Sequence, residues 1–116
     1  MRYLFILNDA PYGSERPYNG LRLCLKLVAR EDAGIRIFLL ADAVGCAKAG
    51  QQTADGTYNI ERMLHGLVTR GVEVGVCGSC MDARGLADDQ LLAGTRRSSM
   101  AQLAEWTAEA DKVLTW

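Results

Sequence analysis

Two nearly continuous apolar segments constrain the fold of this chain more than any other feature of its sequence. They span residues 3–7 and 35–40, and Arg36 is the one charged residue in either. Strands with one exposed face alternate apolar and polar residues, whereas runs of this kind are typical of strands covered on both faces. The alternating valines Val72, Val74 and Val76 indicate a third strand. The sequence therefore predicts a sheet that lies between layers of helices.

The segments between these strands carry helical signals. A helix is predicted from Pro17 to about Arg30, since proline suits a first helical turn. The best-defined helix spans residues 59–70, with apolar residues three and four apart and Asn59 able to cap its start. Residues 86–93 are predicted to form a short helix. Alternation of this kind predicts one α/β domain over residues 1–116, doubly wound and mainly parallel, with helices on both faces.

The C-terminal part of the chain completes this order. Residues 94–97 are predicted to be extended, and Lys112 to Trp116 form a final strand. Between them, the capping-box pattern from Ser99 to Gln102 indicates the start of a last helix. Its inward face is predicted to carry Met100, Leu103, Ala104, Thr107 and Ala110.

Composition limits the function classes open to the chain. The net charge is −1, and the adjacent Arg96 and Arg97 are too few to make a basic patch, so we expect no nucleic-acid partner. No apolar run is long enough for a membrane span, and the N-terminal apolar stretch is too short for a signal peptide. Four cysteines in a chain expected to be cytoplasmic favour catalysis or metal binding over structural disulfides.

The strongest chemical signal is a pair of cysteines directly after the third strand. Cys77 and Cys80 are separated by Gly78 and Ser79, both of which are poor core-filling residues. Groups just past the carboxyl end of a parallel strand face the ligand crevice, so a thiol there is presented for chemistry. A helix N-terminus or a cation such as Arg84 favours the nucleophilic thiolate. Ordinary core packing and an adventitious metal site are the alternatives.

The topology predicts which other residues lie near these thiols. The carboxyl ends of neighbouring parallel strands meet at one edge of the sheet. The loops that follow the first two strands carry Asn8, Tyr12, Ser14 and Asp42. We expect these four side chains to line a pocket beside Cys77. Asp42 is equally suited to capping a short helical piece that begins near it.

Three rival sites fit the sequence less well. A thioredoxin-like exchange site needs a proline on a later strand, and Pro11 and Pro17 both precede the cysteine pair. Structural zinc takes four protein ligands, and Cys24, Cys46 and His65 lack metal-type spacing, so we expect no metal. An intersubunit zinc shared by two cysteine pairs is the exception. No glycine-rich nucleotide motif follows the first strand, and no cofactor is expected.

Several motifs along the chain resemble the DsrE/DsrF-like family. The matching pieces are Asn8, residues 10–15, 21–23, 38–44 and 58–60, the segment from Cys77 to Gly85, and residues 110–114. The resemblance implies a compact α/β fold and cytoplasmic sulfur handling. It also implies a stable homo-oligomer, which in the branch of small members is a hexamer built from trimers.

The resemblance further implies a role for each thiol. In the best-understood members, one cysteine after the third strand carries sulfur as a persulfide, and an Arg-Gly pair follows a short turn later. Counting back from Arg84 and Gly85 puts Cys77 at that position, with Cys80 as a resolving or assisting thiol. The implied partners are sulfur donor and acceptor proteins. The alternative is an oligomeric small-ligand-binding or redox-sensing module without turnover, and which thiol is primary stays open.

Overall fold

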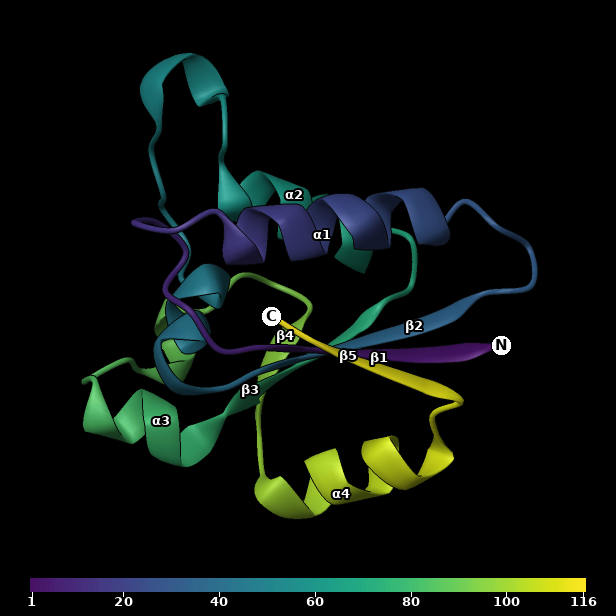
Figure 1. Ribbon diagram of the computed structural model, residues 1–116. Coiled ribbons are helices and arrows are strands. Elements are labelled where there is room, and N and C mark those ends of the chain that lie inside the picture. The colour runs from purple at the N-terminus through teal and green to yellow at the C-terminus, as the bar shows by residue number, and fades with distance from the viewer.

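In the computed structural model, five parallel strands form one sheet with helices on both faces (Figure 1). The structure describes the backbone of residues 1–116 and all side chains except that of Asp55. The sheet order is β4-β3-β2-β1-β5, and every pairing is parallel. The strands are β1 (Arg2–Leu7), β2 (Gly34–Leu39), β3 (Glu73–Cys77), β4 (Thr95–Ser98) and β5 (Lys112–Thr115). The predicted α/β fold with a parallel sheet is thus confirmed.

The helices pack in two layers. In Figure 1, α1 (Arg16–Leu27) and α2 (Ile60–Val68) lie above the sheet, and α4 (Met100–Glu109) lies below it. This division follows from right-handed crossovers: the chain moves from β1 to β3 in one direction and from β4 to β5 in the other. The short α3 (Gly78–Ala83) and the 3₁₀ turns η1 (Ala41–Ala47), η2 (Ala54–Gly56) and η3 (Asp88–Gln90) complete the structure.

The hydrophobic core lies on both faces of the central strands. Phe5 in β1 and Phe38 in β2 are fully buried, as the continuous apolar runs predict. The ring of Phe38 meets Trp106 of α4 edge-on, with the centroids 6.1 Å apart. On the other face, Leu21 of α1 and Leu64 of α2 are fully buried. Among the described residues, no helix is both long and apolar enough to cross a membrane.

Both predicted N-caps are confirmed. Asn59 accepts a hydrogen bond from the Arg62 amide at 2.9 Å, and Ser99 accepts one from the Gln102 amide at 3.2 Å. The capping box at the second site is only half formed, because the Gln102 side chain donates to Glu105. Asn59 and Ser99 therefore satisfy amide groups that the first helical turn leaves without partners.

Three predicted elements differ from the structure. The first helix ends at Leu27 instead of about Arg30, and the segment 86–93 contains only the three-residue turn η3. The extended segment 94–97 is the edge strand β4, whose residue Ser98 pairs with Cys77. Backbone pairing with β3 makes this polar segment a strand, which its own composition does not indicate.

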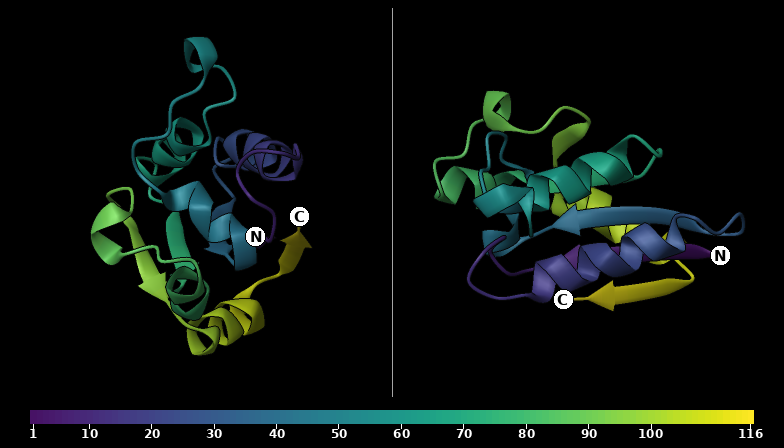
Figure 2. Two further views of the ribbon diagram at one scale, coloured as in Figure 1. Left: turned by 90° about the vertical axis from the view of Figure 1, so that its left-hand side faces the viewer. Right: turned by 90° about the horizontal axis from the view of Figure 1, so that it is seen from above.

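One segment stands away from the body of the molecule. The chain between Gly50 and Tyr58 extends outward beyond α2 in the views of Figures 1 and 2. Tyr58 at its base is half exposed and has a φ of +58°, a conformation uncommon outside glycine. Its ring packs on Tyr18 of α1, with the centroids 4.3 Å apart. This aromatic contact connects the projecting segment to α1.

Candidate thiol site

The two cysteines of interest lie where β3 passes directly into α3. Cys77 is the last residue of the strand, and Gly78 is the first residue of the helix, so no loop separates them. Val74 and Val76 hold the strand in the core, with 2% and 0% of their surfaces exposed. Because the strand is paired on both sides, the backbone of Cys77 is fixed by the sheet.

Burial and hydrogen bonding act in opposite directions on the Cys77 thiol. Burial is the largest single influence and raises the pKa of this thiol, since a charged thiolate loses hydration. Hydrogen bonds from the Ser79 hydroxyl, from the Cys80 amide and thiol, and from the Ser79 amide together outweigh burial, so the pKa lies below its ordinary value of 9.0. The Ser79 oxygen is 3.3 Å from the sulfur. Cys77 is therefore a buried thiol whose surroundings favour the thiolate.

Cys80 lies one turn further along α3 and is more exposed than Cys77. Its sulfur accepts a hydrogen bond from the Ala41 amide at 3.2 Å. Ala41 has a φ of +51°, a left-handed conformation that costs a residue with a side chain about 1 kcal/mol or more. A strained residue at the start of η1 thus directs its amide at the second thiol.

Arg84 and Asp42 form an ion pair beside Cys80. The Arg84 Nε donates to Asp42 Oδ1 at 2.8 Å, and its Nη1 donates to the Cys80 carbonyl at 3.1 Å. Asp42 is the second residue of η1, and no side chain caps that turn. The sequence alternative of a capping role for Asp42 is therefore wrong. The pair instead connects the turn after β2 to the helix after β3.

The structure does not bring the four predicted pocket residues together. The Asn8 amide group donates to the Trp116 carbonyl at 3.3 Å, beside the chain terminus. The Tyr12 hydroxyl donates to Gln51 Oε1 at 2.5 Å, and Ser14 donates to Asp9 at 3.1 Å. Tyr12 and Ser14 line a separate hollow of about 270 Å³ with Tyr18 and Tyr58. Only Asp42 of the four has a hydrogen bond to the segment that holds the cysteines.

Sequence reasoning missed three residues that contact the cysteine turn. In the sequence, Ser79 stands out only as a poor core-filling residue, yet its hydroxyl is a hydrogen-bond partner of Cys77. Ala41 carried no signal, because its role depends on its backbone conformation. Arg97 is, in the sequence, only one half of a basic pair, but it donates to the Gly78 carbonyl at 3.1 Å. Its position in a strand beside Cys77 is the signal that could have identified it.

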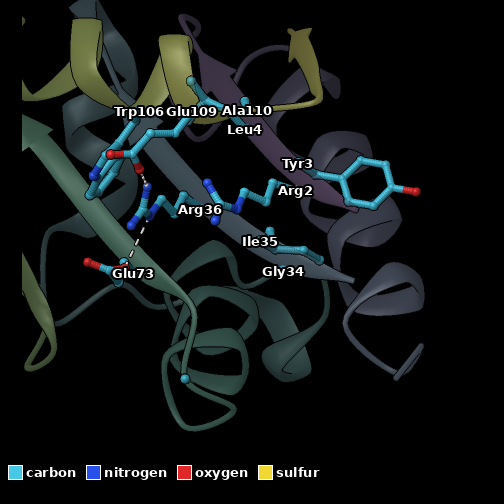
Figure 3. A pocket seen from close by; sticks show the side chains of 11 residues that line it. Arg2, Tyr3, Leu4, Gly34, Ile35, Arg36, Glu73, Trp106, Glu109 and Ala110 are labelled. Atoms are coloured by element: carbon cyan, nitrogen blue, oxygen red, sulfur yellow. Dashed lines mark hydrogen bonds and ion pairs between the residues drawn. The ribbon is translucent and has the colours of Figure 1, made fainter. Parts of the chain in front are cut away.

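A separate hollow lies at the opposite edge of the sheet. It has a volume of about 490 Å³ and is lined by the starts of β1, β2 and β3 and by the end of α4. Figure 3 shows Arg36 between Glu73 and Glu109, with hydrogen bonds of 3.1 and 2.6 Å, and with Trp106 beside it. These charged groups satisfy one another, and none of the cysteines lines the hollow. The thiol site and this hollow are therefore separate.

The other two cysteines occupy the core. Cys24 in α1 and Cys46 in η1 are both fully buried, and all four cysteines are free thiols. Burial raises the pKa of Cys46 to about 12 and raises that of Cys24 further. The predicted core position of Cys24 is confirmed. Among the described side chains, no group of three or more His, Cys, Asp or Glu residues is arranged to hold a metal ion.

Fold and site together define a class of small parallel α/β domains with a paired-cysteine turn at the carboxyl end of the third strand. The chain belongs to the DsrE/DsrF-like family, whose model matches residues 1–116. It is 40% identical to protein YchN of Escherichia coli K12 over 116 residues, covering 99% of this chain and 98% of YchN. The predicted family membership is thereby confirmed.

Two archaeal proteins and one crystal structure extend this comparison. An uncharacterized protein of Methanopyrus kandleri is 36% identical over 109 residues, covering 94% of this chain and 88% of that protein. The crystal structure of E. coli YchN superposes with a TM-score of 0.94, covering 100% of this chain and 99% of YchN. MTH1491 of Methanobacterium thermoautotrophicum, a protein of unknown function, is 16% identical, covers 99% and 98% of the two chains, and shares the fold with a TM-score of 0.77.

Proposed function

We propose that this protein is a cytoplasmic sulfur-transfer protein in which Cys77 carries sulfur as a persulfide. The observation that carries the proposal is the position of Cys77 at the junction of β3 and α3, where the Ser79 hydroxyl lies 3.3 Å from its sulfur and hydrogen bonds lower the pKa of the thiol. A thiolate is the attacking form of cysteine in thiol exchange and in persulfide formation. Membership of the DsrE/DsrF-like family supports the same chemistry.

Loading requires attack by Cys77 on a donor persulfide. The thiolate attacks the outer sulfur of R–S–SH, a bond forms between that sulfur and Cys77, and the donor's sulfur–sulfur bond breaks. The donor leaves as the thiolate R–S⁻, and the persulfide proton stays on the transferred sulfur. Neither oxidant nor reductant is consumed, because one persulfide replaces another. The donors around Cys77 then stabilise the inner sulfur when a partner removes the outer one.

Cys80 provides a second route for release. Its thiolate can attack the inner sulfur of the loaded Cys77, forming a Cys77–Cys80 disulfide and expelling HS⁻. An external dithiol must then reduce the disulfide before another cycle. The hydrogen bond from Ala41 and the tether from Arg84 to the Cys80 carbonyl favour a fixed position for this helix segment. Arg84 and Asp42 are in this proposal residues that position Cys80.

The test is mass spectrometry of the protein after incubation with a cysteine desulfurase and cysteine. We expect a mass gain of one sulfur atom that maps to Cys77. The Cys77→Ser variant should not load, whereas Cys80→Ser should load and lose the disulfide route. An unmodified Cys77 under conditions that load a known carrier would instead favour the oligomeric ligand-binding or redox-sensing alternative. Loading of Cys80 alone would reverse the assignment of the two thiols.

The assembly that we propose is a homohexamer. Tyr12 and Tyr58 are 42% and 50% exposed around one hollow, and Val113 is exposed on the edge strand β5. Exposed apolar groups of this size often mark contact surfaces. The family resemblance supports the same state. Light scattering should give six times the chain mass at micromolar concentration, and a monomer would overturn the proposal.

A further inference from the structure

Arg97 connects three segments around the cysteine turn. From β4, its Nη1 donates to the Gly78 carbonyl at 3.1 Å, its Nη2 to Asp82 Oδ1 at 2.9 Å, and its Nε to Asp88 Oδ1 at 2.8 Å. The planar guanidinium thus binds the first turn of α3, the last turn of α3 and the turn η3 at the same time. The side chain is little more than one-third exposed, so its stem packs along the protein surface.

Gly78 allows this close approach. A Cβ atom at residue 78 would lie 2.8 Å from Arg97 Nη1, 3.1 Å from its Cγ, and 3.2 Å from the Ser98 carbonyl oxygen. A Cβ atom there would push the guanidinium, the flexible end of the arginine side chain, out of its present position. The glycine between the two cysteines therefore favours the Arg97 contact through space, and not through backbone conformation, because its φ is not in the left-handed region.

The Gly78 carbonyl belongs to the same peptide unit as the Ser79 amide. A peptide unit is planar, so a hydrogen bond that fixes the direction of the carbonyl also fixes the direction of the N–H group. Ser79 also carries the hydroxyl whose oxygen lies 3.3 Å from the Cys77 sulfur. By fixing this peptide unit, Arg97 therefore fixes the backbone from which the Ser79 side chain extends.

We infer that Arg97 is a positioning residue of the thiol site, which acts by holding the Gly78–Ser79 peptide and thereby the Ser79 hydroxyl beside the Cys77 sulfur. The inference rests on the proposed function for its biological meaning. Its physical content, an effect of Arg97 on the reactivity of Cys77, can be measured without any sulfur donor. Arg97 does not touch the sulfur and is not itself a catalytic residue.

The experiment measures the rate of iodoacetamide alkylation of Cys77 against pH, in a Cys80→Ser background. Arg97→Met should move the midpoint of the profile upward and slow alkylation at neutral pH by about threefold to tenfold, since a tenfold loss of thiolate corresponds to one pKa unit. Arg96→Met is the matched control: Arg96 is the neighbouring residue, is 76% exposed in its side chain, and pairs with Glu73 instead. The control should leave the profile unchanged.

Two further variants separate positioning from charge and from folding. Arg97→Lys keeps the charge but cannot donate to all three acceptors, so it should recover only part of the alkylation rate. Gly78→Ala keeps Arg97 but displaces its guanidinium, and should slow alkylation in the same direction. Full recovery by lysine, or an unchanged profile in folded Arg97→Met or Gly78→Ala protein, would overturn the inference.

The outcomes distinguish this inference from the proposed function. If wild-type Cys77 accepts no sulfur but Arg97→Met slows its alkylation, the sulfur-transfer proposal fails and the positioning role stands. If Cys77 loads equally well in the wild type and in Arg97→Met, with identical alkylation profiles, the positioning role fails and the sulfur-transfer proposal stands. Circular dichroism and light scattering on each variant verify the fold and the assembly.

Discussion

Cys46 and Cys77 are both buried cysteines, yet their surroundings affect the thiol in opposite directions. Cys46 lies in η1, fully covered by the core, and burial raises its pKa to about 12. Cys77 is 5% exposed, and its pKa falls below its ordinary value of 9.0. Cys46 lies deep in the core, so desolvation dominates its pKa, whereas Cys77 lies near the surface at the end of a strand, where hydrogen bonds outweigh a smaller desolvation. Depth of burial and hydrogen bonding at the strand–helix junction together decide which cysteine is a nucleophile.

The two cysteines of the turn also differ from each other, in exposure and in hydrogen bonding. Cys80 is the more exposed thiol, and its sulfur accepts a single backbone hydrogen bond from Ala41. Cys77 has more donors and less exposed surface. This arrangement suits a pair in which one thiol carries a group and the other removes it.

The largest expected difference is in alkylation by iodoacetamide at neutral pH. A pKa of about 12 for Cys46 and one below 9.0 for Cys77 correspond to thiolate fractions that differ by roughly a thousandfold or more. In a Cys80→Ser background, Cys77 should be labelled while Cys24 and Cys46 stay unmodified. Peptide mapping over a time course measures this, and labelling in urea, where all three sites are exposed, is the control. Equal rates at Cys46 and Cys77 in the native protein would break the comparison.

A smaller difference is expected in the stability of serine variants. Cys46→Ser places a hydroxyl in the fully buried core, where an unpaired polar group costs about 1–3 kcal/mol. Cys77→Ser places the hydroxyl beside the donors of Ser79 and Cys80, so its cost should be about 1 kcal/mol or less. Urea denaturation of both variants at equal protein concentration measures the two free energies of unfolding. A larger loss for Cys77→Ser contradicts the expectation.

The smallest of the three effects comes from removing one donor. Ser79→Ala should raise the pKa of Cys77 and slow its alkylation about fivefold, the equivalent of one neutral hydrogen bond. The two proteins should differ most below pH 9.0 and converge above it, because both thiols are then ionised. Ser14→Ala is the matched control, since the Ser14 hydroxyl bonds Asp9 in another loop. Identical pH profiles for Ser79→Ala and the wild type would show that the Ser79 hydroxyl does not lower the pKa of Cys77.

The lowered pKa of Asp82 sets the sign of the pH dependence of stability near the thiol site. The Arg97 guanidinium bonds Asp82 and holds the pKa of that carboxyl below its ordinary value of 3.8. A depressed carboxyl pKa contributes stability that is present above the unfolded value and is lost as pH falls through the folded one. The contact between Arg97 and α3 therefore weakens only in strong acid, and it is intact over the pH range in which Cys77 titrates.

The amino-acid sequence by itself determined the layered fold and the position of the thiols. Continuous apolar runs around Phe5 and Phe38 specify strands covered on both faces, and local capping by Asn59 and Ser99 sets where two helices begin. These features are short-range or periodic, so they can be read along the chain. The location of Cys77 at the end of a buried strand follows from the same pattern.

Tertiary structure decided which polar residues surround the thiols. Met100, predicted to face inward on the last helix, is 62% exposed, and Trp106 is buried in its place against Phe38. The outward position of Met100 follows from how α4 packs on the sheet, since the bulky indole occupies the contact with Phe38. The pairing of β4 with β3 likewise brings Arg97 over Gly78 across 19 residues of sequence. No periodic pattern encodes such a contact, because it depends on the order of strands in the sheet.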